Sequence, residues 1–201
     1  MWYLMNIKSH FYTIFNIIFH HQKCFVIVNI LYFSCISISL LLFFFLASPS
    51  YESLDNIAPY AQNLVNMGAL YTFLYIFGYA LIMALISVTL PGMVFFPLSI
   101  FSLMYKAILL GARLSSITIS ELLTVFPVLI LEGEAFVIAA FAGTIVGLSW
   151  IKPSLIYPLN DFTRIIAFKK SCKELCNTYL LVVLLLLIST FVETIIIFQF
   201  T

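Results

Sequence analysis

Five long apolar stretches, separated by polar or turn-forming segments, set the pattern of this chain. A helix needs about 20 apolar residues to cross the hydrocarbon layer of a bilayer, and each stretch reaches or approaches that length. The pattern therefore predicts an all-α, polytopic membrane bundle of about five transmembrane helices. The predicted spans are residues 24–47, 64–90, 93–112, 122–150 and 175–198.

The second and third stretches are joined by little more than Pro91-Gly92. Proline cannot donate a backbone hydrogen bond, and it disfavours helical geometry in the residue before it. We therefore expect the second helix to end at this pair. The short connection leaves two alternatives for residues 93–112, a full span in a tight hairpin or a partly re-entrant segment.

Two segments outside the spans are amphipathic. Residues 1–23 repeat apolar side chains at helical spacing beside lysines and histidines, which predicts a helix in the plane of the membrane interface. Its histidines, His20 and His21 among them, are expected on the edge that faces the headgroups. Residues 161–174 predict a second amphipathic helix, on the inner membrane surface, before the last span. The predicted organisation is thus an interfacial helix followed by a transmembrane bundle of residues 24–201.

The amino-acid composition is that of an integral membrane protein. Of its 201 residues, 64% are hydrophobic and only 8% carry a charge, and the mean hydropathy is +1.16. A chain of this size cannot bury so much apolar surface in a water-soluble core, so membrane lipids are expected partners. A nucleic-acid partner is not expected, because the sequence has no basic tail and no basic-aromatic pattern.

The basic residues are distributed unevenly between the predicted loops. Seven of the nine Lys and Arg residues fall in the amino-terminal segment and in the loop of residues 151–174. Loops rich in Lys and Arg tend to stay on the cytoplasmic side of a membrane. We expect a multi-pass protein of the cell membrane with the amino terminus and this loop in the cytoplasm. Five spans then leave the carboxyl terminus outside.

Ionisable side chains inside the predicted spans form the first candidate site. If the third and fourth spans are antiparallel, Lys106 comes within about one helical turn of Glu132, near the middle of the hydrocarbon layer. Glu134 and Glu193 complete this intramembrane polar cluster. Such residues are costly in lipid, so the cluster is either a structural polar lock or a path for ions, protons or a polar substrate.

The fourth span carries small residues at every fourth position, which on a helix share one face where a second backbone can approach closely. We expect this helix-packing stripe to make the fourth span the centre of the bundle. The stripe consists of Ala135, Ala139, Gly143 and Gly147. At the mouth between the third and fourth spans, Arg113 is expected to form an ion pair with Glu121.

The four cysteines, Cys24, Cys35, Cys172 and Cys176, are expected to be free thiols. They fall in apolar segments or on the predicted cytoplasmic side, where thiols stay reduced. Cys172 and Cys176 lie one helical turn apart, but no further ligand is near in sequence to complete a metal site. No Ser-His-Asp, Cys-His or phosphate-loop pattern is present. We therefore expect no catalytic residue, no metal, no cofactor and no enzymatic activity.

Three features follow one another along the chain. Leu-Ala-Ser-Pro at residues 46–49 closes the first span, a proline and a glutamate precede the small-residue helix, and Phe-Val-Glu-Thr occupies residues 191–194. The central feature is formed by Pro127, Glu132, Ala135 and Gly143. With five spans after an in-plane segment, these features resemble the stage II sporulation protein M family over about residues 8–198. That resemblance implies a polytopic membrane scaffold, which in sporulating bacteria belongs to a complex that recruits peptidoglycan hydrolases during engulfment.

Two functions of different classes are therefore predicted. The first is a non-enzymatic scaffold that organises a membrane-associated complex through helix packing. Its partners would be other membrane or cytoplasmic subunits, such as an ATPase or a hydrolase, or further copies of the chain. The alternative is the membrane subunit of a transporter or permease, driven by a separate ATPase, with a polar path through Lys106, Glu132 and Glu134.

Overall fold

The computed structural model describes residues 12–46, 66, 68–115, 117–158 and 162–200. In this part of the chain every regular element is a helix, and five helical segments are long and apolar enough to cross a membrane. The predicted all-α bundle with about five spans is therefore confirmed. The elements are α2 (Gln22–Leu46), α4 (Ala69–Ile82), the π-helix η2 (Met83–Thr89), α5 (Leu90–Val94), α6 (Phe96–Leu114), α7 (Ile119–Ile151), α8 (Pro153–Ile156) and α9 (Arg164–Phe200).

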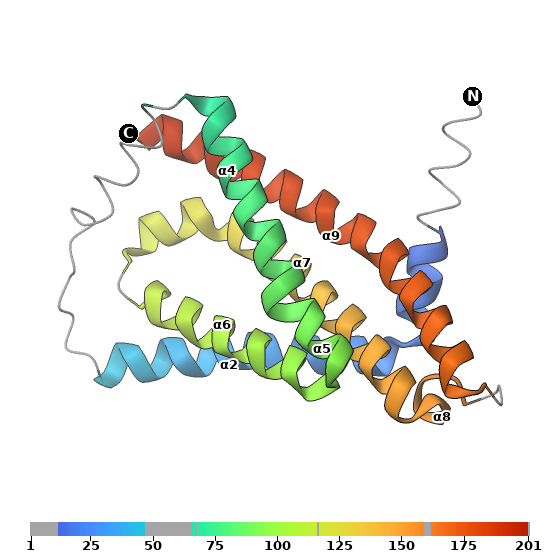
Figure 1. Ribbon diagram of the computed structural model, residues 1–201. Coiled ribbons are helices and arrows are strands. Elements are labelled where there is room, and N and C mark those ends of the chain that lie inside the picture. The colour runs from blue at the N-terminus through green and yellow to red at the C-terminus, as the bar shows by residue number, and fades with distance from the viewer. Residues whose placement is uncertain (1–11, 47–65, 67, 116, 159–161, 201) are drawn as a thin grey trace.

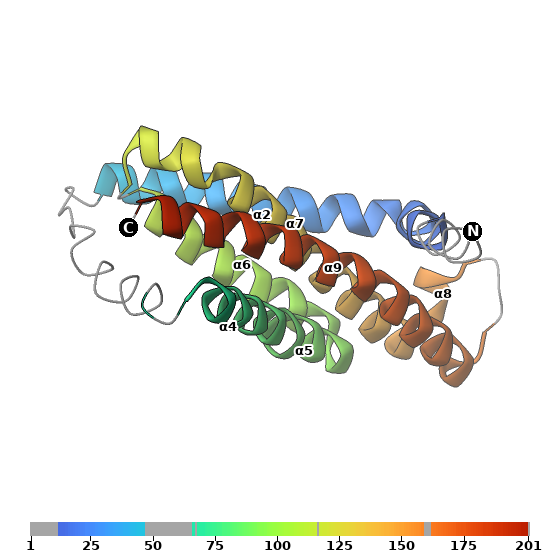
Figure 2. The same ribbon diagram turned by 90° about the horizontal axis from the view of Figure 1, so that it is seen from above.

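Helix α7 runs through the centre of the bundle (Figures 1 and 2). It packs against α2, η2, α5, α6, α8 and α9. Residues 135–147 of α7 are all buried, which requires neighbours around the whole helix and not on one face only. Helix α9 lies along α7 in the antiparallel sense, while α2 and α4 lie on opposite sides of the bundle (Figure 2).

The second span does not end at Pro91-Gly92, as the sequence predicts, but continues through this pair to Val94. The preceding π-helix carries the chain past the proline, because it changes the hydrogen-bond spacing, and the Leu90 N–H donates to Leu85 O five residues back. The chain turns at Phe95, whose φ of −146° and ψ of 109° are extended. Helix α6 then runs for 19 residues, which is long enough for a span in a hairpin.

The last span is longer than predicted. Helix α9 is continuous over 37 residues from Arg164 to Phe200, so the predicted amphipathic helix of residues 161–174 and the predicted span of residues 175–198 form one helix. The sequence between its ends contains no glycine and no proline, and therefore nothing interrupts the helix where its composition changes from polar to apolar.

The described amino-terminal segment begins with a helix over residues 12–20, followed by a turn at His21 that leads into α2. Ile14 and Ile17 are buried, whereas Tyr12 and Phe19 are exposed, so this helix is amphipathic. Residues 1–11 of the predicted interfacial helix lie outside the described residues, as do the predicted end of the first span at residue 47 and the start of the second at residue 64.

Candidate functional site

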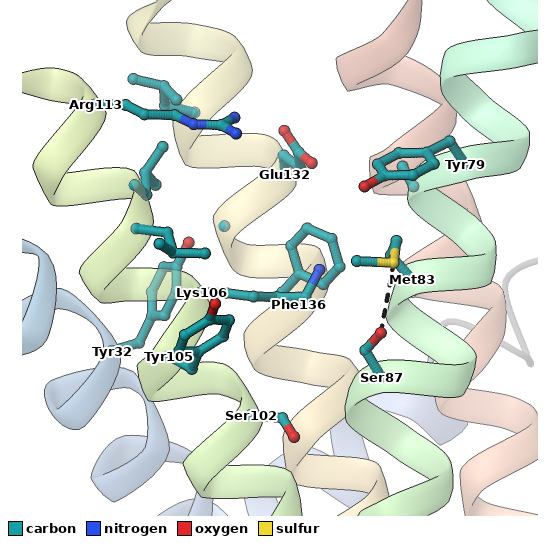
Figure 3. A pocket seen from close by; sticks show the side chains of 15 residues that line it. Tyr32, Tyr79, Met83, Ser87, Ser102, Tyr105, Lys106, Arg113, Glu132 and Phe136 are labelled. Carbon is teal, nitrogen blue, oxygen red and sulfur yellow. Dashed lines mark hydrogen bonds between the residues drawn. The ribbon is translucent and has the colours of Figure 1, made fainter.

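A cavity of about 400 Å³ lies between α2, α4, η2, α6 and α7. Helices α4 and α6 are close together near α5 and diverge towards their other ends, as Figure 1 shows. Tyr79 on α4 and Tyr105 on α6 line the cavity and are 59% and 63% exposed. The cavity therefore opens sideways between these helices. The lining residues labelled in Figure 3 are Tyr32, Tyr79, Met83, Ser87, Ser102, Tyr105, Lys106, Arg113, Glu132 and Phe136.

Two interhelical hydrogen bonds fix how α6 is rotated beside the cavity. Ser39 Oγ of α2 donates to the carbonyl oxygen of Ile108 at 2.7 Å, and Ser99 Oγ of α6 donates to the carbonyl oxygen of Ala140 on α7 at 3.0 Å. These bonds hold one face of α6 against its neighbours, so residues at helical spacing on the adjoining flank face the cavity. That flank carries Ser102, Lys106 and Arg113.

The Lys106 ammonium sits over an aromatic ring at the centre of the cavity. Its Nζ lies 4.0 Å from the centroid of the Phe136 ring (Figure 3), a cation–π contact that is stronger away from water. Glu132 lies one turn before Phe136 on α7, lines the same cavity and is close enough to Lys106 for their charges to interact. The structure thus brings Lys106 and Glu132 together, as antiparallel pairing of the two spans implies.

Glu132 is the acid around which the other predicted residues gather. Glu193 on α9 and Tyr32 on α2 both lie within electrostatic range of it. Tyr32 packs against Gly133, where an added Cβ would lie 3.0 Å from its ring. Glu134 is also close to Tyr32 but is not among the residues that line the cavity.

Arg113 and Glu121, for which the sequence predicts an ion pair at the mouth of the bundle, lie near the end of α6 and the start of α7. The Glu121 carboxylate accepts hydrogen bonds from the Thr118 N–H at 2.8 Å and from the Thr118 hydroxyl at 2.9 Å. This capping box begins α7. Arg113 lines the cavity, and its guanidinium points towards Glu132 (Figure 3).

The helix-packing stripe of α7 faces the backbone of η2 and α5. An added Cβ on Gly143 would lie 2.7 Å from the carbonyl oxygen of Thr89, and one on Gly147 would overlap the carbonyl oxygen of Gly92. The Thr89 hydroxyl lies 3.0 Å from the carbonyl oxygen of Ala84 in its own helix and 3.2 Å from that of Ala139 on α7, and it can donate to either. Ala135 and Ala139 are fully buried. The stripe therefore lies where two backbones touch, with the cavity beside its Glu132 end.

A second polar cluster, at the end of the bundle where α2 and α9 begin, is not evident from sequence. The Tyr157 hydroxyl donates to Glu174 at 2.9 Å, and His21 Nε2 lies 3.4 Å from the same carboxylate without forming a hydrogen bond. His21 is only 7% exposed, so the expectation that it faces the headgroups is wrong. Burial and the Glu174 charge raise the pKa of Tyr157, which keeps its phenol protonated as a donor.

Sequence reasoning finds the charged cavity residues but misses the side chains from α4 and η2. Tyr79, Met83 and Ser87 follow one another at four-residue spacing, which is a helical signal, yet nothing local shows which neighbour they face. In the described part of the chain no group of three or more His, Cys, Asp and Glu side chains could share a metal ion. Cys24, Cys35, Cys172 and Cys176 are free thiols.

The helices and their burial pattern define a polytopic, all-α integral membrane protein. The family model of stage II sporulation protein M matches residues 11–196, and the chain belongs to that family. The resemblance found in its sequence is therefore confirmed. Neither a curated protein nor a solved structure gives a significant match to the chain.

Proposed function

We propose that this protein is a non-enzymatic membrane scaffold of the stage II sporulation protein M type, which organises a membrane-associated complex through helix packing. The observation that carries this proposal is a set of hydrogen bonds that hydroxyl groups form between helices inside the bundle. They bind α7 to the elements around it along most of its length, with bonds from Thr89 to Ala139, from Ser99 to Ala140, from Ser189 to Val128 and between Ser149 and Ser171.

Such bonds favour a bundle that keeps one shape. Each interhelical hydrogen bond in a membrane contributes about 0.6 kcal/mol, and at most about 2 kcal/mol. Several on one helix oppose the rocking of one group of helices against another that alternating access requires. A fixed arrangement suits a protein whose task is to hold partners in place.

The end of the bundle that contains the loop after α7 offers a docking surface for such partners. Most of its lysine and arginine side chains are exposed, whereas Lys170 is partly buried over the Tyr157 ring and Glu174 is partly buried against the same tyrosine. We assign this basic surface to the cytoplasmic side, because Lys and Arg are retained there. The amino terminus is then inside and the carboxyl terminus outside. The exposed basic residues are Lys23, Lys152, Arg164, Lys169 and Lys173.

Purification of the full chain from its own cells in mild detergent tests the scaffold. We expect partner subunits, such as an ATPase or a hydrolase, at a constant ratio to the chain. Lys169→Glu with Lys173→Glu should reduce their recovery, because both residues are exposed and basic, while Lys169→Arg with Lys173→Arg retains it. Recovery of the chain alone, under conditions where it stays folded, would contradict the proposal.

The cavity favours one second candidate, the membrane subunit of a permease. Lys106 and Glu132 line it at the middle of the bundle, and a polar path would include them but bypass Glu134, which does not line it. The test is flux of candidate polar substrates through proteoliposomes that contain the chain and any ATPase purified with it. If Lys106→Met with Glu132→Gln abolishes flux and leaves assembly intact, the protein is a permease subunit and the scaffold proposal is wrong.

A further inference from the structure

The cavity places polar groups at a depth where lipid alone would leave them without partners. Tyr79 lies ten residues into α4 and Lys106 eight residues before the end of α6. At about 1.5 Å per residue these positions are roughly 12–15 Å from the helix ends, close to the middle of a hydrocarbon layer about 30 Å thick. Tyrosines exposed to lipid normally lie at the headgroup level, so these positions require another explanation.

The chemistry of the lining is that of an anion site. Two cations, Lys106 and Arg113, and one carboxylate, Glu132, line the cavity, so the formal charge of the lining itself is positive by one (two minus one). The carboxyl groups of Glu134 and Glu193 are near this cluster but do not line the cavity. The ammonium has three N–H donors, and its contact with the Phe136 ring leaves donors available for a ligand. Hydroxyl groups of serine and tyrosine add further donors. A group with several acceptor oxygens and a negative charge matches this excess of donors.

The way in is through the side of the bundle. Tyr79 and Tyr105 stand on the two helices that flank the opening. Around them the outer faces of η2 and α6 are apolar, with Ile86, Phe101 and Leu109 being 57%, 63% and 44% exposed. A ligand with a phosphate group and long acyl chains satisfies both surfaces, because its polar part fits the cavity and its chains stay against the apolar faces.

We propose that this cavity binds the phosphate-bearing headgroup of an anionic membrane lipid, which enters sideways between α4 and α6. The phosphoryl oxygens face Lys106 and Arg113, and the phenol groups of Tyr79 and Tyr105 lie at the entrance. This site is independent of whether the protein serves as a scaffold or as a permease, since it needs only the bundle itself.

Thermal unfolding and native mass spectrometry of the full chain test the site. The purified protein is placed in neutral detergent and titrated with phosphatidylglycerol, with phosphatidylcholine or with inorganic phosphate. At about 100 times its Kd, phosphatidylglycerol should raise Tm by about 5–10 °C, whereas the other two should have little effect. Lys106→Met with Arg113→Gln removes both cations of the lining and should weaken binding of phosphatidylglycerol at least about tenfold.

Lys169→Met is the matched control, because it removes an exposed lysine far from the cavity and should leave affinity unchanged. Unchanged affinity in the paired cavity variant overturns the proposal. If inorganic phosphate stabilises the protein as much as phosphatidylglycerol does, the cavity is a site for a soluble anion and the lipid proposal is wrong. If phosphatidylcholine binds equally well, the site does not select negative charge and the proposal is wrong. Should the paired variant not fold, Arg113→Gln at the exposed end of the cavity decides by the same criterion.

Discussion

The two parts of α7 pack in opposite ways. Residues 135–147, the close-packed half, are buried throughout, and here the backbone of η2 and α5 lies against the helix. Residues 121–134, the open half, carry large side chains, of which Leu123 and Phe126 are 70% and 52% exposed. The cavity lies beside this half, at Glu132. The size of the side chains along one helix thus decides whether its neighbours touch it or leave room for a site.

Polar groups are used differently in the two halves. In the close-packed half, Ser99 donates to a carbonyl oxygen of α7, the Thr89 hydroxyl lies within hydrogen-bond distance of another, and both residues are fully buried. In the open half, Lys106 contacts an aromatic ring and lies near Glu132, with cavity space around it. The first arrangement is fixed by the backbone, whereas the second leaves charged side chains beside open space. The polar groups around the two halves of α7 therefore differ in what they contact.

The largest effect should come from filling the close-packed half. Gly143→Leu places a side chain where even a Cβ would lie 2.7 Å from a backbone oxygen of η2, and it should lower the free energy of unfolding by about 3 kcal/mol or more. Gly78→Leu is the matched control, because nothing lies within 4 Å of a Cβ there. Thermal unfolding in detergent measures both. Equal tolerance of the two would mean that the close contact is not required.

Breaking the charge pair should have the next largest effect. Lys106→Met removes a cation whose charge acts on Glu132 in the cavity, which should cost about 1–2 kcal/mol of unfolding free energy. Glu132→Gln should cost a similar amount. The paired variant should lose less than the sum, with a coupling energy of about 1 kcal/mol. A double-mutant cycle by thermal unfolding checks this, and additive losses would show that the two side chains act independently.

Much of the close-packed half could be predicted from sequence. The length of the apolar stretches and the four-residue spacing of Ala135, Ala139, Gly143 and Gly147 are local properties, and they survive into the structure because membrane helices form before they pack. The proximity of Lys106 and Glu132 could also be predicted from sequence, because two consecutive spans joined by a short connection must be antiparallel.

The other features depend on contacts that no local pattern records. The continuation through Pro91 depends on a π-helix, whose wider turn has no sequence signature of its own. The side chains that α4 and η2 contribute to the cavity depend on how far α4 diverges from α6. His21 is buried because the distant Tyr157 and Glu174 return to the start of α2, and the polarity of histidine alone indicates a headgroup-facing position instead.

The smallest effect separates hydroxyl groups that join helices from those that bond within their own helix. Thr89→Val should lower the free energy of unfolding by about 1 kcal/mol. Its hydroxyl is shared between Ala84 of its own helix and two partners on other helices, the carbonyl oxygen of Ala139 on α7 and the Tyr179 hydroxyl on α9. Ser37→Ala should change it by less than about 0.5 kcal/mol, because the Ser37 hydroxyl bonds only to Phe33 of its own helix. Thermal unfolding compares the two. If their losses are equal, the hydroxyl bonds to α7 do not hold the bundle in one shape, and shape matching between backbones alone must do so.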